Sequence, residues 1–483
     1  MSRTPPLAVA LVLAALAFEL HGQGLPPDHQ LARDLLAELV AINTTHERGN
    51  TTPAAEAMAR RLLAAGFPAG DVRVLGPSTG NHNLVARLRG TGARRPILLL
   101  AHLDVVEARR EDWSLDPFTL TEKDGYFYGR GTSDIKDMAA LFVATLIRFR
   151  REGFVPDRDL ILALTAGEES GADYNGVQWL LEHRRDLIDA AYCINGDSGD
   201  PLTRDGRPFA RNVQASEKVY MSFALAAHNP GGHSSLPSRD NAIYDLAAAL
   251  TRIAGYTFPI RLNEITRAYF TRVAATLSPA LADDIPGVLR TPPDAGAAAR
   301  LSAASPFFNA QLRTTCVATR VEAGHADNAL PQTARAVVNC RLLPDERPAD
   351  VVATIRHLVG GGVGGVGGVG GVGGGDAPVV VTVLDSAVPS PPSPLVPEVM
   401  GALERVTAAL WPGVPVVPYM ETGATDGLYL RNAGMPVYGV SGVFLDAGDI
   451  RSHGRDERIG VREYYEGAEF TYRFLKALAN APR

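Results

Sequence analysis

The stretch PILLLAHLDVV, residues 96–106, decides the fold. Its apolar run at 96–101 is typical of a strand buried on both faces, as the central strands of parallel sheets are. Further short apolar runs at 160–165 and 191–195 predict strands, and the helical spacing of apolar residues predicts the intervening helices. Those helices are expected at 31–42, 54–63, 138–149 and 177–183. Alternating strands and helices predict an α/β domain with a parallel-rich sheet.

The pattern changes near residue 215. Strands are expected at 218–227, 311–319, 333–342 and 378–384, and helices at 241–253 and 349–359. That order, βαββαβ, is the split βαβ arrangement of a ferredoxin-like α+β domain. Helix–strand–helix spacing returns after residue 396, so the smaller domain is expected to be inserted in the larger. The predicted boundaries are a signal peptide at 1–24, the larger domain at 25–214 and 386–483, and the inserted domain at 215–385.

Two stretches stand apart from this plan. Residues 256–308 are mixed in character and receive no assignment. The run GGGVGGVGGVGGVGGG, residues 360–375, cannot bury enough surface to offset its backbone entropy, so a flexible helix-to-strand loop is expected. A phosphate-binding loop is the alternative, but the run lacks the Lys-Ser/Thr of such loops and their strand-to-helix setting.

The N-terminus has the form of an export signal. Arg3 precedes the apolar run at 7–18, which is too short to span a bilayer but suits the core of a signal peptide. Residues 15–17, Ala-Leu-Ala, form one cleavage signal, and a cut nearer Gly22 fits equally. No later segment has the length of a transmembrane helix. We therefore expect an exported protein, periplasmic or secreted, with no transmembrane span in the mature chain, or one tethered only by an uncleaved signal.

Composition narrows the classes of partner. A formal net charge of -6 and the absence of a basic stripe interleaved with aromatics argue against nucleic acid. The three cysteines, Cys193, Cys316 and Cys340, are odd in number and form no C-x-x-C pattern. No disulfide framework is expected, and a metal would have to be held by histidines and carboxylates.

Candidate metal ligands follow successive predicted strands or precede a helix. They are His102, Asp134, Glu169, Asp197 and His453, accompanied by Asp104 and Glu168. Because parallel strands end at one edge of a sheet, all are expected at the same rim. Imidazole and carboxylate are the usual ligands of catalytic zinc, and a neighbouring carboxylate commonly orients a ligating imidazole. Either motif alone, His-x-Asp or Glu-Glu, is most often a solvated polar pair, whereas their joint placement favours a site.

The ordered motifs resemble those of the di-zinc metallopeptidase family that contains aminoacylase, carnosinase-type dipeptidases and glutamate carboxypeptidase. The resemblance runs from about residue 30 to the C-terminus. The matching stretches are LLLAHLDVV (98–106), GRGTSDIKDMAA (129–140), TAGEESGA (165–172), INGD (194–197), NPGGHSSLP (229–237), NALPQTARAVVNCRLLP (328–344) and RSHGRDERI (451–459). It implies a zinc-dependent exopeptidase-like catalytic domain, with the inserted domain serving as a lid and a dimerisation domain.

The resemblance also implies a metal-ligand set. Asp134 would bridge two zinc ions, with His102 and Asp197 completing one site and Glu169 and His453 the other. Cobalt or manganese are expected as substitutes. The family uses Glu or Asp at the position of Asp197, and Asp is more like its dipeptidase and aminopeptidase members than its acylases.

The remaining implied roles concern catalysis and substrate. Glu168 would be the general base, and Asp104 would orient His102. His233 in the lid would polarise the scissile carbonyl, reaching across a dimer interface. The implied substrate-binding residues are Asn328, Arg341 and Gly423.

The residues alone leave alternatives for this lid set. His233 lies in a turn marked by prolines and glycines and could be a surface histidine. Arg341 could be a strand-edge charge paired with Asp345 or Glu346. For dimerisation, the strand at 218–227 is expected to pair at a sheet edge with its symmetry mate.

These observations predict a metallopeptidase that cleaves an amide bond of a small peptide, as a dipeptidase or carboxypeptidase. A zinc-bridged hydroxide would attack the carbonyl while Glu168 takes the proton. An N-acyl amino acid deacylase or deacetylase of the same family is the alternative. A non-catalytic binding protein would lack a ligand or the base, and this chain lacks none. A serine hydrolase would need G-x-S-x-G, and the nearest stretch, GVSGV at Gly439, lacks it.

Overall fold

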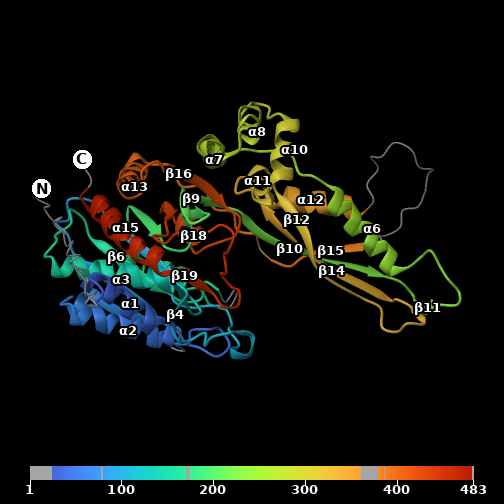
Figure 1. Ribbon diagram of the computed structural model, residues 1–483. Helices are drawn as coiled ribbons and strands as arrows, with labels where there is room; N and C mark the ends of the chain where they lie inside the picture. Colours follow the sequence, from blue (N-terminus) through green and yellow to red (C-terminus); the bar gives the residue numbers. More distant parts are fainter. Residues whose placement is uncertain (1–23, 78–79, 170–173, 361–378, 386, 481–483) are drawn as a thin grey trace, which may run out of the picture.

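The computed structural model describes residues 24–77, 80–169, 174–360, 379–385 and 387–480. Most of the expected signal peptide (1–24) and of the glycine run (360–375) lies outside the described residues. A larger α/β unit carries an elongated second unit that projects from it (Figure 1). Over the described ranges, no helix combines the length and the apolar character needed to cross a membrane.

A 10-stranded mixed sheet forms the centre of the larger unit, in the order β1-β2-β6-β3-β7-β17-β9-β8-β18, with β16 paired to β9. Its strands are β1 (Val72–Leu75), β2 (Asn83–Leu88), β3 (Ile97–His102), β6 (Leu160–Thr165), β7 (Tyr192–Asn195), β8 (Leu202–Arg204), β9 (Arg207–Glu217), β16 (Val416–Glu421), β17 (Val437–Gly439) and β18 (Leu445–Asp446). The central pairs β3/β6, β3/β7 and β7/β17 are parallel, so their carboxyl ends share one edge. The α/β prediction is confirmed.

Helices cover both faces of this sheet. One face packs against α1 (Pro27–Ala41), α2 (Thr52–Ala64), α3 (Lys136–Arg151), α13 (Pro397–Leu410) and α15 (Val461–Ala479), and the other against α4 (Gly176–His183), α5 (Arg185–Ile188) and α14 (Gly427–Asn432). Alternate side chains of β3 enter the two cores, Leu99 and Ala101 on one face and Leu98 and Leu100 on the other. This two-sided burial explains why the run at 96–101 contains no polar residue.

A small sheet joins two distant loops. It consists of β4 (Thr121–Lys123), β5 (Tyr126–Tyr128) and β19 (Arg458–Gly460), and it follows the short helix η2 (Arg110–Asp112). Strand β5 leads directly into the GRGTSD turn at 129–134, and β19 directly follows the RSHGRDE loop at 451–457. Because β5 and β19 pair antiparallel, with Tyr128 opposite Arg458, the two loops lie side by side.

The second unit is a four-stranded antiparallel sheet in the order β12-β14-β10-β15. Its elements are β10 (Val219–His228), α6 (Ala242–Gly255), β12 (Thr315–Ala323), β14 (Thr333–Leu342), α12 (Pro348–Val359) and β15 (Val379–Val383), with β11 (Gly232–His233) and β13 (Ala329–Leu330) at its tip. The order along the chain is the predicted βαββαβ, and both helices pack on one face. Strand β10 has a partner on each side, so the expectation that it forms a free edge is wrong. The edges are β12 and β15.

The stretch without a sequence assignment is helical. It holds α7 (Glu264–Val273), η3 (Ala274–Thr276), α8 (Pro279–Ala282), α9 (Ile285–Val288), α10 (Ala295–Ala304) and α11 (Pro306–Leu312). These helices pack against Val417 and Tyr419 of β16. A further short helix of the described chain, η1 (Ala69–Asp71), lies outside this stretch and directly precedes β1. The strand expected at 311–319 begins later, at Thr315, because helix α11 occupies the chain as far as Leu312. Ser305 caps the start of that helix, accepting a hydrogen bond from the amide of Phe307 at 3.2 Å.

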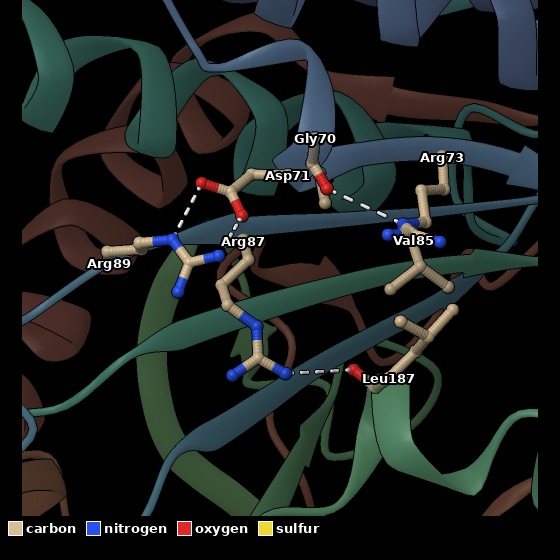
Figure 2. Close-up of a pocket in the computed structure, with 8 residues that line it drawn as sticks. Gly70, Asp71, Arg73, Val85, Arg87, Arg89 and Leu187 are labelled. Carbon is tan, nitrogen blue, oxygen red and sulfur yellow. Dashed lines mark hydrogen bonds and ion pairs between the residues drawn. The ribbon is translucent and has the colours of Figure 1, made fainter.

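Strands β1 and β2 border a cavity of about 190 Å³ at the outer edge of the large sheet (Figure 2). Asp71 accepts hydrogen bonds there from Nε and Nη2 of Arg89, at 2.9 and 2.6 Å. Arg87 donates to the carbonyl of Leu187 at 3.3 Å and pairs with Asp159 at 2.9 Å. No predicted site residue lines this cavity.

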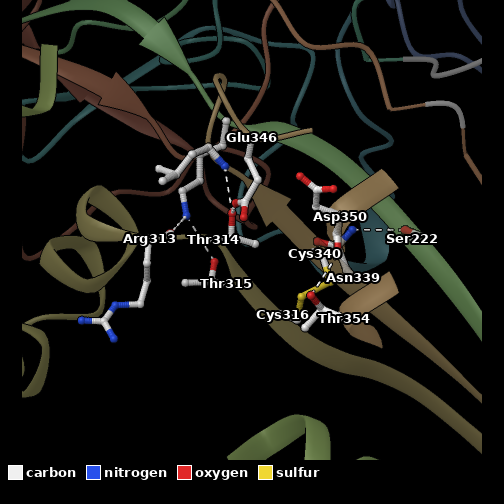
Figure 3. The surroundings of a disulfide bond; sticks show 12 residues. Ser222, Arg313, Thr314, Thr315, Cys316, Asn339, Cys340, Glu346, Asp350 and Thr354 are labelled. Atoms are coloured by element: carbon white, nitrogen blue, oxygen red, sulfur yellow. Dashed lines mark hydrogen bonds between the residues drawn. A yellow bond between two sulfur atoms is a disulfide. The ribbon is translucent and has the colours of Figure 1, made fainter. Parts of the chain in front are cut away.

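One disulfide joins two strands of the second unit. It corrects the expectation, drawn from the odd number of cysteines, that no disulfide framework forms. Cys316 of β12 and Cys340 of β14 are directly opposite in the register of the two strands and are bonded (Figure 3). An odd number of cysteines is compatible with one bridge because Cys193 remains free and buried. The pairing depends on strand register, which the count and spacing of cysteines do not contain.

Candidate active site and metal centre

The predicted ligands meet at one edge of the large sheet. His102 ends β3, Glu168 and Glu169 follow β6, and Asp197 follows β7. These three strands are neighbours and parallel, so their carboxyl ends deliver the four side chains to one place. Asp134, at the start of α3, joins them.

Asp134 lies between two imidazoles. Its Oδ1 lies 3.2 Å from Nε2 of His102, and its Oδ2 lies 3.1 Å from Nε2 of His453. Nε2 of His453 also lies 2.8 Å from Oε1 of Glu169. The two oxygens of one carboxylate therefore face different histidines, which is the geometry that a bridging ligand requires.

Two groups of three side chains could each hold a metal ion, because the ligand atoms within each group all lie within 4.8 Å of one another. One contains His102, Glu168 and Asp197, and the other contains His102, Asp134 and Glu169. The first group differs from the expected set in having Glu168, assigned as the base, among the ligand-forming atoms. Imidazole and carboxylate are the donor types of catalytic zinc sites, so the residues present fit a divalent metal.

The electrostatics of the cluster also fit a cation. Burial, and after it the charge of Asp197, raises the pKa of Glu168 well above the usual range of a carboxyl. Burial also raises the pKa of Asp197. Hydrogen bonds that the His453 imidazole donates to the carboxylates of Asp134 and Glu169 raise the pKa of His453 to about 10. Buried carboxylates that lie close together repel one another, so their ionised forms are unfavourable. A bound cation reduces this repulsion.

The contacts of the Asp104 side chain differ from the expected ones. Nδ1 of His102 is 2.9 Å from the backbone carbonyl oxygen of Asp104, whereas the nearest carboxylate oxygen is 4.0 Å away. The carboxylate instead accepts hydrogen bonds from the amides of Gly167, at 2.8 Å, and Glu169, at 2.9 Å. Its side chain therefore positions the Glu168–Glu169 turn, and its backbone orients His102.

A cavity of about 390 Å³ adjoins this cluster. Its lining includes Glu168 and Asp426 from the metal side, Lys218 and Tyr220 from the start of the second unit, and Leu428 from α14. The cavity thus lies where the two units meet, next to the proposed base. Concave sites between structural units are common places for substrates.

Arg341 and Gly423 lie near this cavity. The Arg341 guanidinium stands over the ring of Tyr220 at 4.7 Å, and burial lowers its pKa. Strand β14 is flanked by β12 and β10, so Arg341 is not the strand-edge charge that was the alternative. The amide of Gly423 donates to Oε1 of Glu421 at 3.1 Å.

His233 and Asn328 lie at the tip of the second unit. Nδ1 of His233 accepts hydrogen bonds from Ser235, and the carbonyl oxygen of Asn328 accepts one from the amide of Ser234 at 3.0 Å. In Figure 1, strand β11, which ends at His233, lies at the far end of the second unit, away from β6. Asn328 directly precedes its partner strand β13. Within one chain, the structure therefore brings these two together but not to the metal cluster.

Three polar residues of the site were missed in the sequence. Asp426 is buried, accepts hydrogen bonds from Asn175 at 2.5 Å and Thr165 at 3.3 Å, and has its pKa raised by burial to about 6. Arg130 and Glu457 form a buried ion pair of 2.6 Å beside Asp134. The available signal was position, since Asp426 follows β16, and Arg130 and Glu457 lie inside motifs already singled out for their ligands.

The chain is similar to known proteins in sequence and in fold. The chain matches the model described as Peptidase family M20/M25/M40 over residues 98–477. The N-fatty-acyl-amino acid synthase/hydrolase PM20D1 of Homo sapiens is 28% identical over 462 residues, which cover 91% of this chain and 85% of that protein. Two solved structures share the fold. An M20 family metallo-carboxypeptidase from Sulfolobus solfataricus has a TM-score of 0.66 at 17% identity and covers 93% of this chain and 99% of that one. Human carnosine dipeptidase 1 has a TM-score of 0.64 at 18% identity, with 93% and 96% covered.

Proposed function

Because the chain belongs to peptidase family M20/M25/M40, we propose that it hydrolyses an amide bond of a small peptide, as a dipeptidase or carboxypeptidase, with two bound zinc ions. The observation that carries this proposal is the position of Asp134 between His102 and His453, with Glu168 beside them. The solved relatives described as a metallo-carboxypeptidase and a dipeptidase support the same class of substrate.

The observed distances support part of the proposed ligand sets, because Asp134 lies between His102 and His453 and His453 lies beside Glu169. Asp197 is grouped with His102 and Glu168. Asp134 would be shared, His102 and Asp197 would complete one site, and Glu169 and His453 the other. When bound, the two cations acidify a water molecule and polarise the substrate carbonyl. Cobalt or manganese are proposed as functional substitutes because the donor set suits them as well.

Glu168 is proposed as the general base. It lines the cavity and takes a proton from the attacking water, then delivers it to the leaving amine. Its raised carboxyl pKa suits a group that must accept and release a proton near neutral pH. Asp104 holds the turn that carries this carboxylate through the amides of Gly167 and Glu169.

We further propose that a second copy of the chain completes the site. His233 is exposed at the tip of the second unit and would donate a hydrogen bond to the developing oxyanion of its partner. Edge strand β12 presents Val317, 61% exposed, and Val321, 70% exposed, and is the proposed dimer contact. Arg341 and Asn328 would bind the carboxylate end of the substrate, and the Gly423 backbone would approach it.

A second candidate is hydrolysis of N-acyl amino acids. The cavity beside Glu168 also has apolar lining from Val219, Val388 and Leu428, which can take an acyl group. The human relative named for fatty-acyl amino acids supports this substrate class.

We also propose that the N-terminal segment at 1–24 directs export of the protein. This proposal is supported by the sequence of the segment alone.

The deciding experiment is a substrate panel with zinc-loaded protein. The panel compares dipeptides, longer peptides that serve as carboxypeptidase substrates, and N-acyl amino acids of increasing acyl chain length. Glu168→Gln is the matched inactive control. Hydrolysis of the peptides and not of the acyl series supports the main proposal. A preference for the acyl series favours the second candidate, and no hydrolysis of any member by metal-loaded protein refutes both.

A further inference from the structure

The loops that carry Asp134 and His453 are joined by a buried carboxylate. Glu457 is fully buried, four residues after His453, and its side chain faces the GRGTSD turn. Its Oε1 accepts hydrogen bonds from the amides of Ser133, at 2.8 Å, and of Asp134 itself, at 3.2 Å. The amide of Gly131 and the hydroxyl of Ser133 add contacts at 3.1 Å each. One side chain from the His453 segment therefore fixes the backbone of the bridging ligand.

A reciprocal contact runs in the opposite direction. Arg130, in the turn that carries Asp134, donates from Nη1 to Oε2 of Glu457 at 2.6 Å and from Nη2 to the carbonyl oxygen of His453 at 3.4 Å. Its guanidinium also stands over the ring of Trp113 at 5.0 Å. His453 has a φ of 63°, a left-handed conformation that a residue with a Cβ adopts only when its surroundings hold it.

We propose that Arg130 and Glu457 are positioning residues of the metal centre, which set the relative placement of Asp134 and His453. Each residue belongs to one loop and holds the backbone of the ligand in the other. The β5/β19 ladder ends at Tyr128 and Arg458, and one backbone hydrogen bond, from Gly129 to Glu457 at 3.1 Å, continues it. Nearer the ligands, the two side chains and a contact of 3.2 Å between the hydroxyls of Ser133 and Ser452 join the loops. This inference rests on the proposed metal centre.

A buried ion pair can also serve stability alone, so a comparison pair is needed. Asp71 and Arg89 provide one at the outer edge of the sheet, with a buried carboxylate but an arginine side chain that is 68% exposed (Figure 2). The Asp71 carboxylate is buried and accepts two hydrogen bonds from the arginine, at 2.9 and 2.6 Å. Its loss should affect folding without reaching the metal ligands.

The test is Glu457→Gln against Asp71→Asn, measured by zinc titration and by the visible absorption of cobalt-substituted protein. Glutamine keeps the shape of Glu457. Its NH₂ group, however, would face one of the N–H groups from which the carboxylate now accepts a hydrogen bond. We expect zinc affinity to fall about 10- to 100-fold, the usual effect of removing a group that holds a metal ligand, with an altered cobalt spectrum. Asp71→Asn should leave both unchanged.

Arg130→Lys is the second variant, and it decides the matter if Glu457→Gln does not fold. Lysine keeps the charge beside Glu457 but cannot reach the His453 carbonyl at the same time, so the cobalt spectrum should change here too. Folded variants that bind zinc and cobalt like the unmodified protein would overturn the inference. Failure of the unmodified protein to bind metal would instead refute the proposed metal centre, which keeps the two failures distinct.

Discussion

Asp104→Asn separates two roles that the sequence and the structure assign to one carboxylate. The side chain accepts hydrogen bonds from the amides of Gly167 and Glu169 at 2.8 and 2.9 Å. The backbone carbonyl oxygen of Asp104 lies within hydrogen-bond distance of the His102 ring. Asparagine has one acceptor oxygen and one NH₂ group, so one of the two amides loses its partner and faces a donor. A hydrogen bond to a charged group contributes about 1.5–3 kcal/mol. If that energy is lost in positioning Glu169, metal affinity falls about 10- to 150-fold, since about 1.4 kcal/mol corresponds to tenfold.

The location of the loss tests the reasoning. In an Asp197→Ala background, the remaining site depends on Glu169 and His453, and adding Asp104→Asn should weaken zinc binding by that factor. In a His453→Ala background, the remaining site depends on His102 and Asp197, and the same change should have little effect. Calorimetric zinc titrations of the two pairs of variants measure this. The opposite pattern would mean that the carboxylate orients His102 after all, and unchanged affinity in both backgrounds would remove any positioning role.

Four further predictions follow from the site and the fold. Glu168→Gln should lose about 10²–10⁴-fold in turnover with metal content unchanged, which steady-state kinetics and metal analysis would show. His233→Ala should lose about 10²–10³-fold, and mixing it with Glu168→Gln after subunit exchange should restore part of the activity; no recovery would refute action across a dimer. In metal-free protein, the His453 pKa of about 10 lies above its unfolded value, so its stabilising charge is complete below about pH 6.5 and lost as pH rises towards 10, which melting curves against His453→Ala would reveal. Cys316→Ser with Cys340→Ser should cost about 3 kcal/mol of unfolding free energy with zinc affinity unchanged, measured by denaturant titration.

Much of the fold could be predicted from short-range pattern. The runs at 97–102, 160–165 and 192–195 are strands because every side chain in them is buried on one face of the sheet or the other, and that leaves a continuous apolar signature. The βαββαβ order could be predicted from a different signal, the alternation of buried and more exposed side chains in strands such as β14, which has one face on the core. The helices at 264–312 were not assigned because they cover β16 with a few aromatic and aliphatic contacts each, too short for a clear period.

Pairing partners could not be predicted from pattern. The central place of β10 and the Cys316–Cys340 bond both depend on which strands lie next to each other and in which register. Local periodicity is the same for an edge strand and for a central strand that exposes one face. The local pattern of residues 218–227 therefore does not distinguish an edge position of β10 from a central one.

The candidate ligands could be predicted because each lies at the end of a recognisable element, and a parallel sheet places such ends together. Groups that hold those ligands carry no such mark. Glu457 sits between Asp456 and Arg458 in a run of charges that reads as solvated surface, yet it is fully buried with an ion pair and four further hydrogen bonds. Burying a carboxylate is costly unless its oxygens are satisfied, so a charge kept there in the described fold marks a place where alignment matters more than the cost. The candidate ligands can be predicted from the sequence, whereas the residues proposed to align them are found only from contacts between loops more than 300 positions apart.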